Sequence, residues 1–438
     1  MGGYIPNTPA DRQEMLGALG LSRADDLFAA VPEGLRVSGL NLEPGKSEME
    51  VRRMVEAMAE KNTRYRSIFR GAGSYDHYIP AIVKSVTGKE EFVTAYTPYQ
   101  AEISQGVLQS IFEYQTDICE LTGMDVSNAS VYDGAVAAAE AALMCQERRR
   151  TKVVLSGALH PQVIEVVRTY CGSRSIPVLV IPPKDGGTDL AAVARALDDE
   201  TACLCFQQPS YCGVMEDAGS LCRAAHEAGA KAVMSVNPIA MGILKTPGEC
   251  GADVAVGEGQ PLGIPMAFGG PYLGFMAATK ALMRRLPGRI VGQTVDSKGE
   301  RAFVLTLQAR EQHIRREKAS SNICSNEALC AMTAAVYLAA MGPEGLCECA
   351  RQCYDNAHYA AKELCGLEGF GLKFERPFFH EFVTSCPVEP ETLCRGLSER
   401  GILGGLPIDG GILWCCTEKT GKQEIDELVC AVREVCGK

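Results

Sequence analysis

The stretch from residue 253 reads Asp253-Val-Ala-Val-Gly-Glu-Gly-Gln-Pro-Leu-Gly-Ile-Pro-Met-Ala-Phe-Gly-Gly-Pro271, a short apolar strand that leads directly into a glycine-rich loop. Glycine lets the backbone turn tightly and approach a ligand or a neighbouring segment closely. Other apolar segments of strand length, most of them separated by helical patterns, cover residues 152–156, 177–181, 203–206, 231–235 and 272–276. This alternation predicts an α/β fold with a mainly parallel sheet covered by helices on both faces.

Ligands of such sheets bind beyond the carboxyl ends of the strands. Three segments fall there, namely Gln207–Tyr211, Val236–Pro238 and the glycine-rich loop, so we expect them to converge on one crevice. Asp133 and Gly134 precede an alanine-rich helix, whose free N-terminal amides suit a phosphate or a carboxylate. Any capped alanine helix gives the same pattern, so this segment alone does not establish an anion site.

The composition is that of a globular protein. The 438 residues are 46% hydrophobic and 22% charged, which is enough to bury a large core in two or three domains. The net charge of −11 argues against nucleic-acid binding, because contact with phosphates requires clustered Lys and Arg. The first residues lack a basic segment followed by an apolar one, and we find no run of about 18 apolar residues. We therefore expect a cytoplasmic protein without membrane contact.

Three domains are expected: a helical arm at 1–65, a large α/β domain at 66–325 and a small C-terminal α+β domain at 326–438. In the arm, helices should begin behind Thr8 and Ser47, which are capping residues.

The large domain also contains an amphipathic helical pattern at 107–121 and a hairpin pattern around 296–300. A long helical region should run from about residue 326 to residue 367.

Twenty cysteines occur in the chain, many of them inside apolar runs. In a long chain without a secretion signal they are better interpreted as free thiols than as a disulfide framework. Cys347, Cys349 and Cys353 have the only spacing that suggests a metal, and the last two would share one face of a helix. Three thiols without a paired Cys or His motif leave a zinc site short of a ligand, so we expect no metal site.

Three polar segments are candidates for binding. Residues 69–80 combine glycines with Ser74 and His77, and residues 96–106 are rich in hydrogen-bonding side chains. Residues 310–324 are dense in charge. Two of them also have a purely structural interpretation: residues 96–106 as a surface loop that caps a helix, and residues 310–324 as a solvated helix face.

Four long motifs resemble glycine decarboxylase, the P-protein of the glycine cleavage system, over nearly the whole chain. They are Tyr96-Thr-Pro-Tyr-Gln-Ala-Glu-Ile-Ser-Gln-Gly106, Leu121-Thr-Gly-Met-Asp-Val-Ser-Asn-Ala-Ser130, Pro287-Gly-Arg-Ile-Val-Gly292 and Arg310-Glu-Gln-His-Ile-Arg-Arg-Glu-Lys-Ala-Ser-Ser-Asn-Ile-Cys324. They match the N-terminal half of that protein, which in many bacteria is a separate polypeptide, subunit 1, paired with a subunit 2.

The resemblance implies the type I fold of pyridoxal-phosphate-dependent enzymes, with active sites at a subunit interface. In the homologous catalytic half, a lysine between a strand and a glycine-rich turn forms the Schiff base with pyridoxal phosphate. Gln260 stands at the matching position here, and an amide nitrogen cannot form an imine. The acidic partner of the pyridine nitrogen is also missing, since the comparable strand end, Met234–Pro238, holds no carboxylate.

The resemblance therefore implies a subunit with no catalytic residue of its own, which completes the site of a cofactor-binding subunit 2 in a heterotetramer. That enzyme decarboxylates glycine and passes the aminomethyl group to the lipoylated H-protein. The residues expected to contact the cofactor across the interface are Tyr96, Thr97, Tyr99, Gln100, Glu102 and Asn322. The residues expected to contact glycine are Ser74, His77, Arg315 and Arg316. Two alternatives stay open: a self-sufficient pyridoxal-phosphate lyase or decarboxylase, and a purely structural or regulatory subunit.

Overall fold

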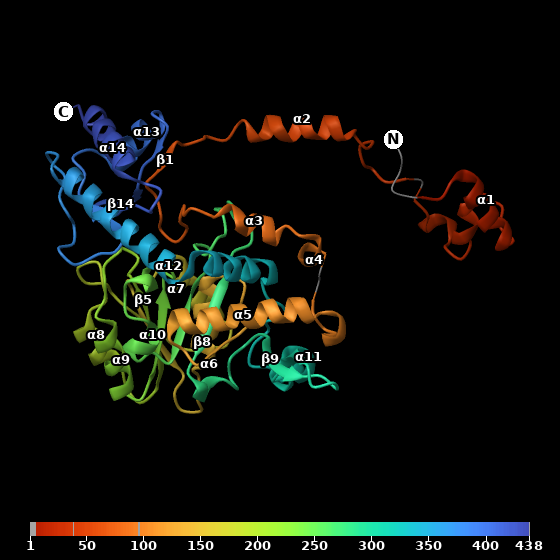
Figure 1. Cartoon of the computed structure of the whole chain (residues 1–438), viewed down its shortest axis with the longest axis horizontal. Coiled ribbons are helices and arrows are strands. Elements are labelled where there is room, and N and C mark those ends of the chain that lie inside the picture. Colours follow the sequence, from red (N-terminus) through yellow and green to blue (C-terminus); the bar gives the residue numbers. More distant parts are fainter. Residues whose placement is uncertain (1–5, 38, 95–96, 438) are drawn as a thin grey trace. The chain divides into compact units, whose positions relative to one another are not determined.

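The chain divides into two compact units in the computed structural model, Met1–Thr63 and Arg64–Lys438 (Figure 1). The structure describes residues 6–37, 39–94 and 97–437. The boundary between a large and a small domain near residue 325 stays a prediction.

The first unit contains two α-helices, α1 (Pro9–Ala18) and α2 (Glu48–Ala59). The predicted starts of both helices are confirmed, because Thr8 and Ser47 each cap a helix and form a capping box with the residue three positions on. Among the described residues of this unit, Leu16 is the only buried apolar side chain. The unit therefore has almost no core of its own.

A seven-stranded sheet forms the centre of the second unit (Figure 1). Its strands are, in spatial order, β2 (Val126–Ser127), β8 (Gly274–Ala278), β7 (Val254–Glu258), β6 (Lys231–Val236), β5 (Thr201–Gln208), β3 (Lys152–Ser156) and β4 (Val178–Ile181). Neighbouring strands from β7 to β4 run parallel. At the other edge, β8 runs antiparallel to both of its neighbours, β7 and β2. The predicted mainly parallel α/β sheet is confirmed, although its last predicted strand begins two residues later.

Helices cover both faces of this sheet. Successive side chains of a strand point to opposite faces, so each strand contributes to two cores. In β3, Val153 and Leu155 pack in the core beneath α6 and α7, whereas Val154 packs in the core beneath α5, α8, α9 and α12. These helices are α5 (Gln105–Thr122), α6 (Gly134–Met144), α7 (Pro161–Gly172), α8 (Leu190–Ala196), α9 (Ala218–Glu227) and α12 (Ala328–Cys365). Shorter helices are α3 (Ala81–Thr87), α4 (Glu90–Val93), α10 (Pro247–Cys250) and α11 (Gln312–Arg315).

The C-terminal part contains a three-stranded antiparallel sheet and two helices, drawn in blue in Figure 1. Their bounds are β11 (Glu381–Thr384), β14 (Gly411–Cys415), β13 (Leu406–Ile408), α13 (Pro390–Ser398) and α14 (Lys422–Val435). The predicted hairpin is also confirmed, by β9 (Ile290–Val295) and β10 (Arg301–Thr306). A parallel pair, β1 (Ser67–Ile68) and β12 (Ile402–Leu403), joins the start of the second unit to its C-terminal part.

Helix α12 confirms the predicted long helical region but is interrupted at Gly342, whose φ of 63° and ψ of 177° are not helical, and Pro343 follows. By length and mean hydropathy alone, α12 would be able to cross a membrane. In the structure, Ala331, Ala334 and Ala350 are fully buried against the large sheet. These residues of α12 pack in the core of the large sheet.

Candidate functional site

A cavity of about 300 Å³ lies at the carboxyl ends of the parallel strands. The predicted convergence of three loops is confirmed, because residues that end β5, β6 and β7 line this cavity together with residues from distant segments. The lining residues are Ala72, Gly73, Ser74, Tyr75, Asp133, Gly134, Ala135, His160, Gln162, Val163, Gln207, Ser235, Val236, Asn237, Pro238, Glu258, Pro261 and Tyr272. No lysine is present among these lining residues of the described chain.

Gln260 follows β7, is 1% exposed, and binds backbone groups with its whole amide. Its Oε1 accepts a hydrogen bond from the Tyr75 N–H at 2.9 Å, and its Nε2 donates to the Tyr75 carbonyl at 2.9 Å and to the Ile264 carbonyl at 2.7 Å. Gln260 therefore fixes the cavity-lining segment Ala72–Tyr75.

Two further side chains bind the same segment. Glu381 of β11 accepts hydrogen bonds from the Ala72 N–H at 2.6 Å and from the Tyr75 hydroxyl at 2.9 Å. The Nε2 of His160 lies 2.9 Å from the Ala72 carbonyl oxygen. Burial raises the pKa of Glu381 to about 7, because the two hydrogen bonds offset only part of the cost of burying a carboxylate.

Glu258 occupies the N-terminus of α6 with its own carboxylate. Its Oε2 accepts from the Gly134 N–H at 3.0 Å, and its Oε1 accepts from the N–H groups of Gln260 at 3.0 Å and Leu273 at 2.9 Å. Burial raises the pKa of Glu258 to about 7 although these three N–H groups oppose the shift. The Gly134 amide that the sequence suggested for an external anion thus already has an acceptor within the chain.

The two residues expected in the segment 69–80 lie in different surroundings. Ser74 lines the cavity, and its Oγ is 2.7 Å from the Tyr272 hydroxyl oxygen. His77, expected to contact glycine, is not among the lining residues, and its ring is buried.

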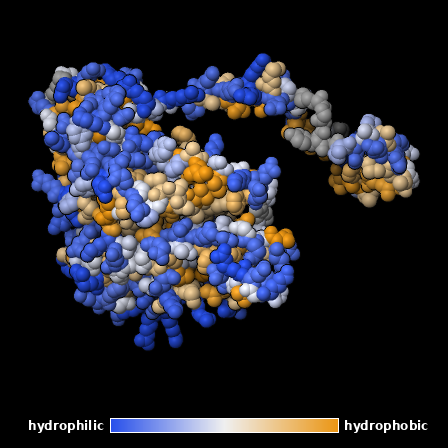
Figure 2. All heavy atoms as spheres, in the orientation of Figure 1, coloured by the Kyte–Doolittle hydropathy of each residue, from blue (hydrophilic) through white to orange (hydrophobic). Residues whose placement is uncertain are grey.

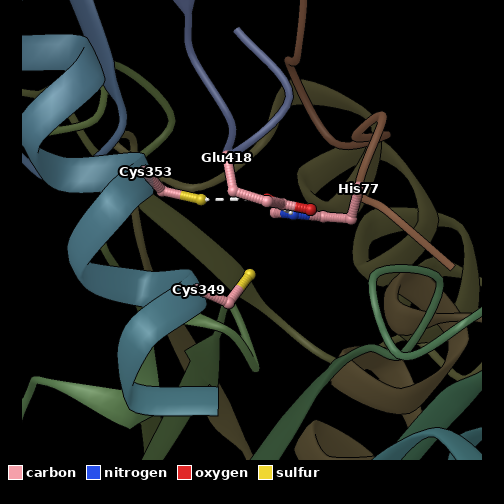
Figure 3. Close-up of side chains that lie close together, drawn as sticks. All are labelled: His77, Cys349, Cys353 and Glu418. Atoms are coloured by element: carbon pink, nitrogen blue, oxygen red, sulfur yellow. Dashed lines mark hydrogen bonds and ion pairs between the residues drawn. The ribbon is translucent and has the colours of Figure 1, made fainter. Parts of the chain in front are cut away.

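His77 belongs to a buried cluster with Cys349, Cys353 and Glu418, which we call the His–Cys cluster (Figure 3). Its Nδ1 lies 2.7 Å from Glu418 Oε2. Burial lowers the pKa of His77, but Cys349 and Glu418 beside the ring outweigh burial and raise it to about 9. The expectation of no metal rested on a missing fourth ligand, and that premise is wrong, because the fold adds a histidine and a carboxylate to the two thiols.

The loop after α4 carries most of the other expected residues. Tyr96 lies outside the described residues. Thr97 is half-buried, Gln100 and Glu102 are exposed, and Tyr99 is 66% exposed. The Arg289 guanidinium lies over the Tyr99 ring, 5.5 Å from its centroid.

The expected residues do not form one site within this chain. Arg315, Arg316 and Asn322 are exposed, and none of them lines the cavity. Ser74 alone of the expected residues faces the cavity.

Sequence reasoning missed the residues that organise the cavity. Glu258 is two positions from Gln260, and Glu381 lies in an otherwise apolar strand, so each offered a recognisable pattern: a carboxylate where burial is expected. Tyr75 and Glu418 offered none, because their partners are more than a hundred residues away in sequence.

The parallel sheet, the ligand cavity at its strand ends and the small C-terminal sheet define the type I fold of pyridoxal-phosphate-dependent enzymes. Glutamate decarboxylase of Lactobacillus brevis has this fold, with a TM-score of 0.69 over 94% of this chain and 97% of its own, at 14% identity. The chain belongs to the glycine cleavage system P-protein family, whose model matches residues 2–432.

Relatives along the full length agree with this assignment. The chain is 51% identical to the probable glycine dehydrogenase (decarboxylating) subunit 1 of Moorella thermoacetica, over 99% of both chains. It superposes with a TM-score of 0.94 and 41% identity on a crystal structure of glycine decarboxylase (P-protein) in inhibitor-bound form, covering 99% of this chain and 100% of the other.

The cavity of this chain does not fit pyridoxal phosphate. The Gly134 amide, which could hold the phosphate, is already bonded to Glu258. Within the described lining there is no lysine for attachment, and the β6 end, residues 234–238, offers no carboxylate for the pyridine nitrogen. The described lining thus offers neither an amine to attach the cofactor nor a carboxylate to pair with its pyridine nitrogen.

Proposed function

We propose that this chain is subunit 1 of a two-subunit glycine dehydrogenase (decarboxylating) whose partner, subunit 2, binds pyridoxal phosphate. The observation that carries the proposal is the cavity that no lysine lines and in which Glu258 accepts the Gly134 N–H. Gln260, in this proposal, stands where a catalytic subunit has its lysine. It has become a structural residue that binds Tyr75 and Ile264.

The N-terminal unit supports a role in assembly. Its surface is rich in apolar side chains, which Figure 2 shows as orange spheres among polar ones. Leu35, Val37, Leu40 and Leu42 are all more than 70% exposed. Exposed apolar side chains in such number indicate a surface that another chain covers. We assign that partner as subunit 2, because the relatives are named as subunits.

We assign to the exposed loop that contains Tyr99, Gln100 and Glu102 the role of completing the active site of subunit 2. These side chains project hydrogen-bonding groups without using them in the core of this chain. Arg315 and Arg316 are the exposed cations suited to the carboxylate of glycine. Ser74 and His77 face the interior of this chain, so we assign neither to the shared site.

The proposed reaction is decarboxylation of glycine followed by transfer of the aminomethyl group to the lipoylated H-protein. Bound pyridoxal phosphate would supply the electron sink for decarboxylation. This chain would supply positioning groups and exclude water at the interface.

Treatment with pyridoxal phosphate and borohydride tests the division of labour. This chain alone should show no stoichiometric lysine adduct by mass spectrometry, whereas subunit 2 should carry one adduct. Exchange of glycine carboxyl with bicarbonate, assayed with H-protein, should require both subunits. A stoichiometric adduct at a single lysine of this chain would instead favour a self-sufficient pyridoxal-phosphate enzyme.

Replacement of Tyr99 and Gln100 by alanine tests the interface. We expect the exchange rate of the co-expressed enzyme to fall at least about tenfold, since loss of a positioning contact worth about 1.4 kcal/mol has this effect. Tyr78→Ala is the matched control, because Tyr78 is 63% exposed but lies outside this loop. An intact complex with an unchanged exchange rate would favour a purely structural or regulatory subunit.

A further inference from the structure

The His–Cys cluster joins three segments that are far apart in sequence. Cys349 and Cys353 lie one turn apart on α12, so both sulfur atoms project from the same helix face (Figure 3). His77 comes from the segment after β1, and Glu418 follows β14. One ligand atom from each of the four residues lies within 4.8 Å of all the others.

These donors have the chemistry and nearly the spacing of a tetrahedral zinc site. Zn²⁺ binds thiolate sulfur at about 2.3 Å and nitrogen or oxygen at about 2.1 Å, which places neighbouring ligand atoms roughly 3.4–3.8 Å apart. Cys353 Sγ already lies 3.3 Å from Glu418 Oε2. Small side-chain movements would bring the four atoms from their present separation to the coordination distance.

In the part of the chain that the structure describes, the only cation beside these donors is the His77 ring itself, which is one of the four proposed ligands. Within the described residues, Glu418 forms an ion pair with His77 but with no lysine or arginine. Two thiols and a carboxylate buried together are costly to ionise without a positive charge. The side chain of His77 is 2% exposed, and its Nε2 atom has no hydrogen-bonding partner among the described residues. Within that part of the chain, the ring is thus held through Nδ1 alone.

The other Glu418 oxygen holds the carboxylate in place. Its Oε1 accepts a hydrogen bond from the Tyr78 N–H at 2.5 Å, which leaves Oε2 directed at the cluster. Such outer contacts orient metal ligands in proteins. The cluster is thus arranged before any ion binds.

We propose that Cys349, Cys353, His77 and Glu418 bind one structural zinc ion. Binding releases the two thiol protons and the extra proton of the His77 ring, since metal ligands must be deprotonated. Four protein ligands leave no open position for substrate, so the ion has a structural role. It would fasten the segment at 72–78, which lines the cavity, to α12 and to the turn after β14. The inference does not depend on the proposed enzymatic function.

Metal analysis of the purified chain tests this site. After expression with added zinc, mass spectrometry of the elements should find about one zinc per chain, and the double variant Cys349→Ser/Cys353→Ser should retain less than a tenth of it. Cys347→Ser is the matched control, because Cys347 lies on the same helix but its Sγ donates to the Gly242 carbonyl outside the cluster. This control should keep its zinc.

Two further measurements keep the test decisive if the double variant folds poorly. Co²⁺ added to the wild-type chain after zinc removal should give thiolate-to-cobalt charge-transfer absorption and the d–d bands of tetrahedral cobalt. A zinc chelator should lower the melting temperature of the wild-type chain. A chain without zinc or cobalt bands, or with a Cys349–Cys353 disulfide after purification under reducing conditions, would overturn the proposal.

Discussion

Gln260→Ala is expected to lower the free energy of unfolding by about 3–5 kcal/mol. The substitution leaves the Tyr75 N–H, the Tyr75 carbonyl and the Ile264 carbonyl without their buried partner, and each unsatisfied group costs roughly 1–3 kcal/mol. Urea unfolding can be followed by the fluorescence of Trp414, the single tryptophan, which is fully buried.

Gln109→Ala is the matched control for this measurement. Gln109 lies on the exposed face of α5, where its amide donates to Glu113 at 2.8 Å, so its loss should change the free energy of unfolding by less than about 0.5 kcal/mol. If Gln260→Ala has an equally small effect, the three hydrogen bonds do not stabilise the fold. The segment Ala72–Tyr75 would then require another explanation for its position.

Glu381→Gln is expected to remove a pH dependence of stability. The folded-state pKa of Glu381, about 7, lies above the ordinary value of 4.5 for a glutamate, so the folded chain binds more protons between these two values. The contribution of this residue to the free energy of unfolding therefore falls as the pH rises from about 4.5 to about 7. A shift of this size corresponds to about 3 kcal/mol.

The measured quantity is the difference in unfolding free energy between Glu381→Gln and wild type at several pH values. As the pH rises from 5 to 8, the unfolding free energy of the variant should increase relative to that of wild type by up to about 3 kcal/mol. A constant offset is also expected, because glutamine keeps one of the two acceptors that bind Ala72 and Tyr75. Glu165→Gln, on the exposed surface of α7, should give a difference that does not change with pH, and a flat profile for Glu381→Gln would contradict the prediction.

Sequence patterns predicted the parts of the fold that depend on local periodicity. The strands of the large sheet, the capped helices at Thr8 and Ser47 and the long helix after residue 326 follow from the spacing of apolar residues and from capping chemistry. The cavity at the strand ends followed from topology, since parallel strands place their carboxyl ends at one edge.

The contacts around the cavity did not follow from the sequence, because they join residues across long separations. Gln260 was recognised for the imine that it cannot form, but its hydrogen bonds to Tyr75 require the folded chain. His77 was expected to contact glycine, yet Glu418 and the thiols of α12 lie around it. Side chains that act across an interface with another chain cannot be located from one chain's periodicity.

The passage of α12 from one core into another has a consequence for cooperativity. Residues before and just after the break at Gly342, such as Ala331 and Ala350, belong to the core of the large sheet, whereas Ala357 and Leu364 belong to the core of the C-terminal sheet. One continuous element thus contributes to two cores, and neither core can lose it without exposing apolar surface in the other. We therefore expect Arg64–Lys438 to melt as one thermodynamic unit, and a proteolytic cut in α12 to release no independently stable fragment.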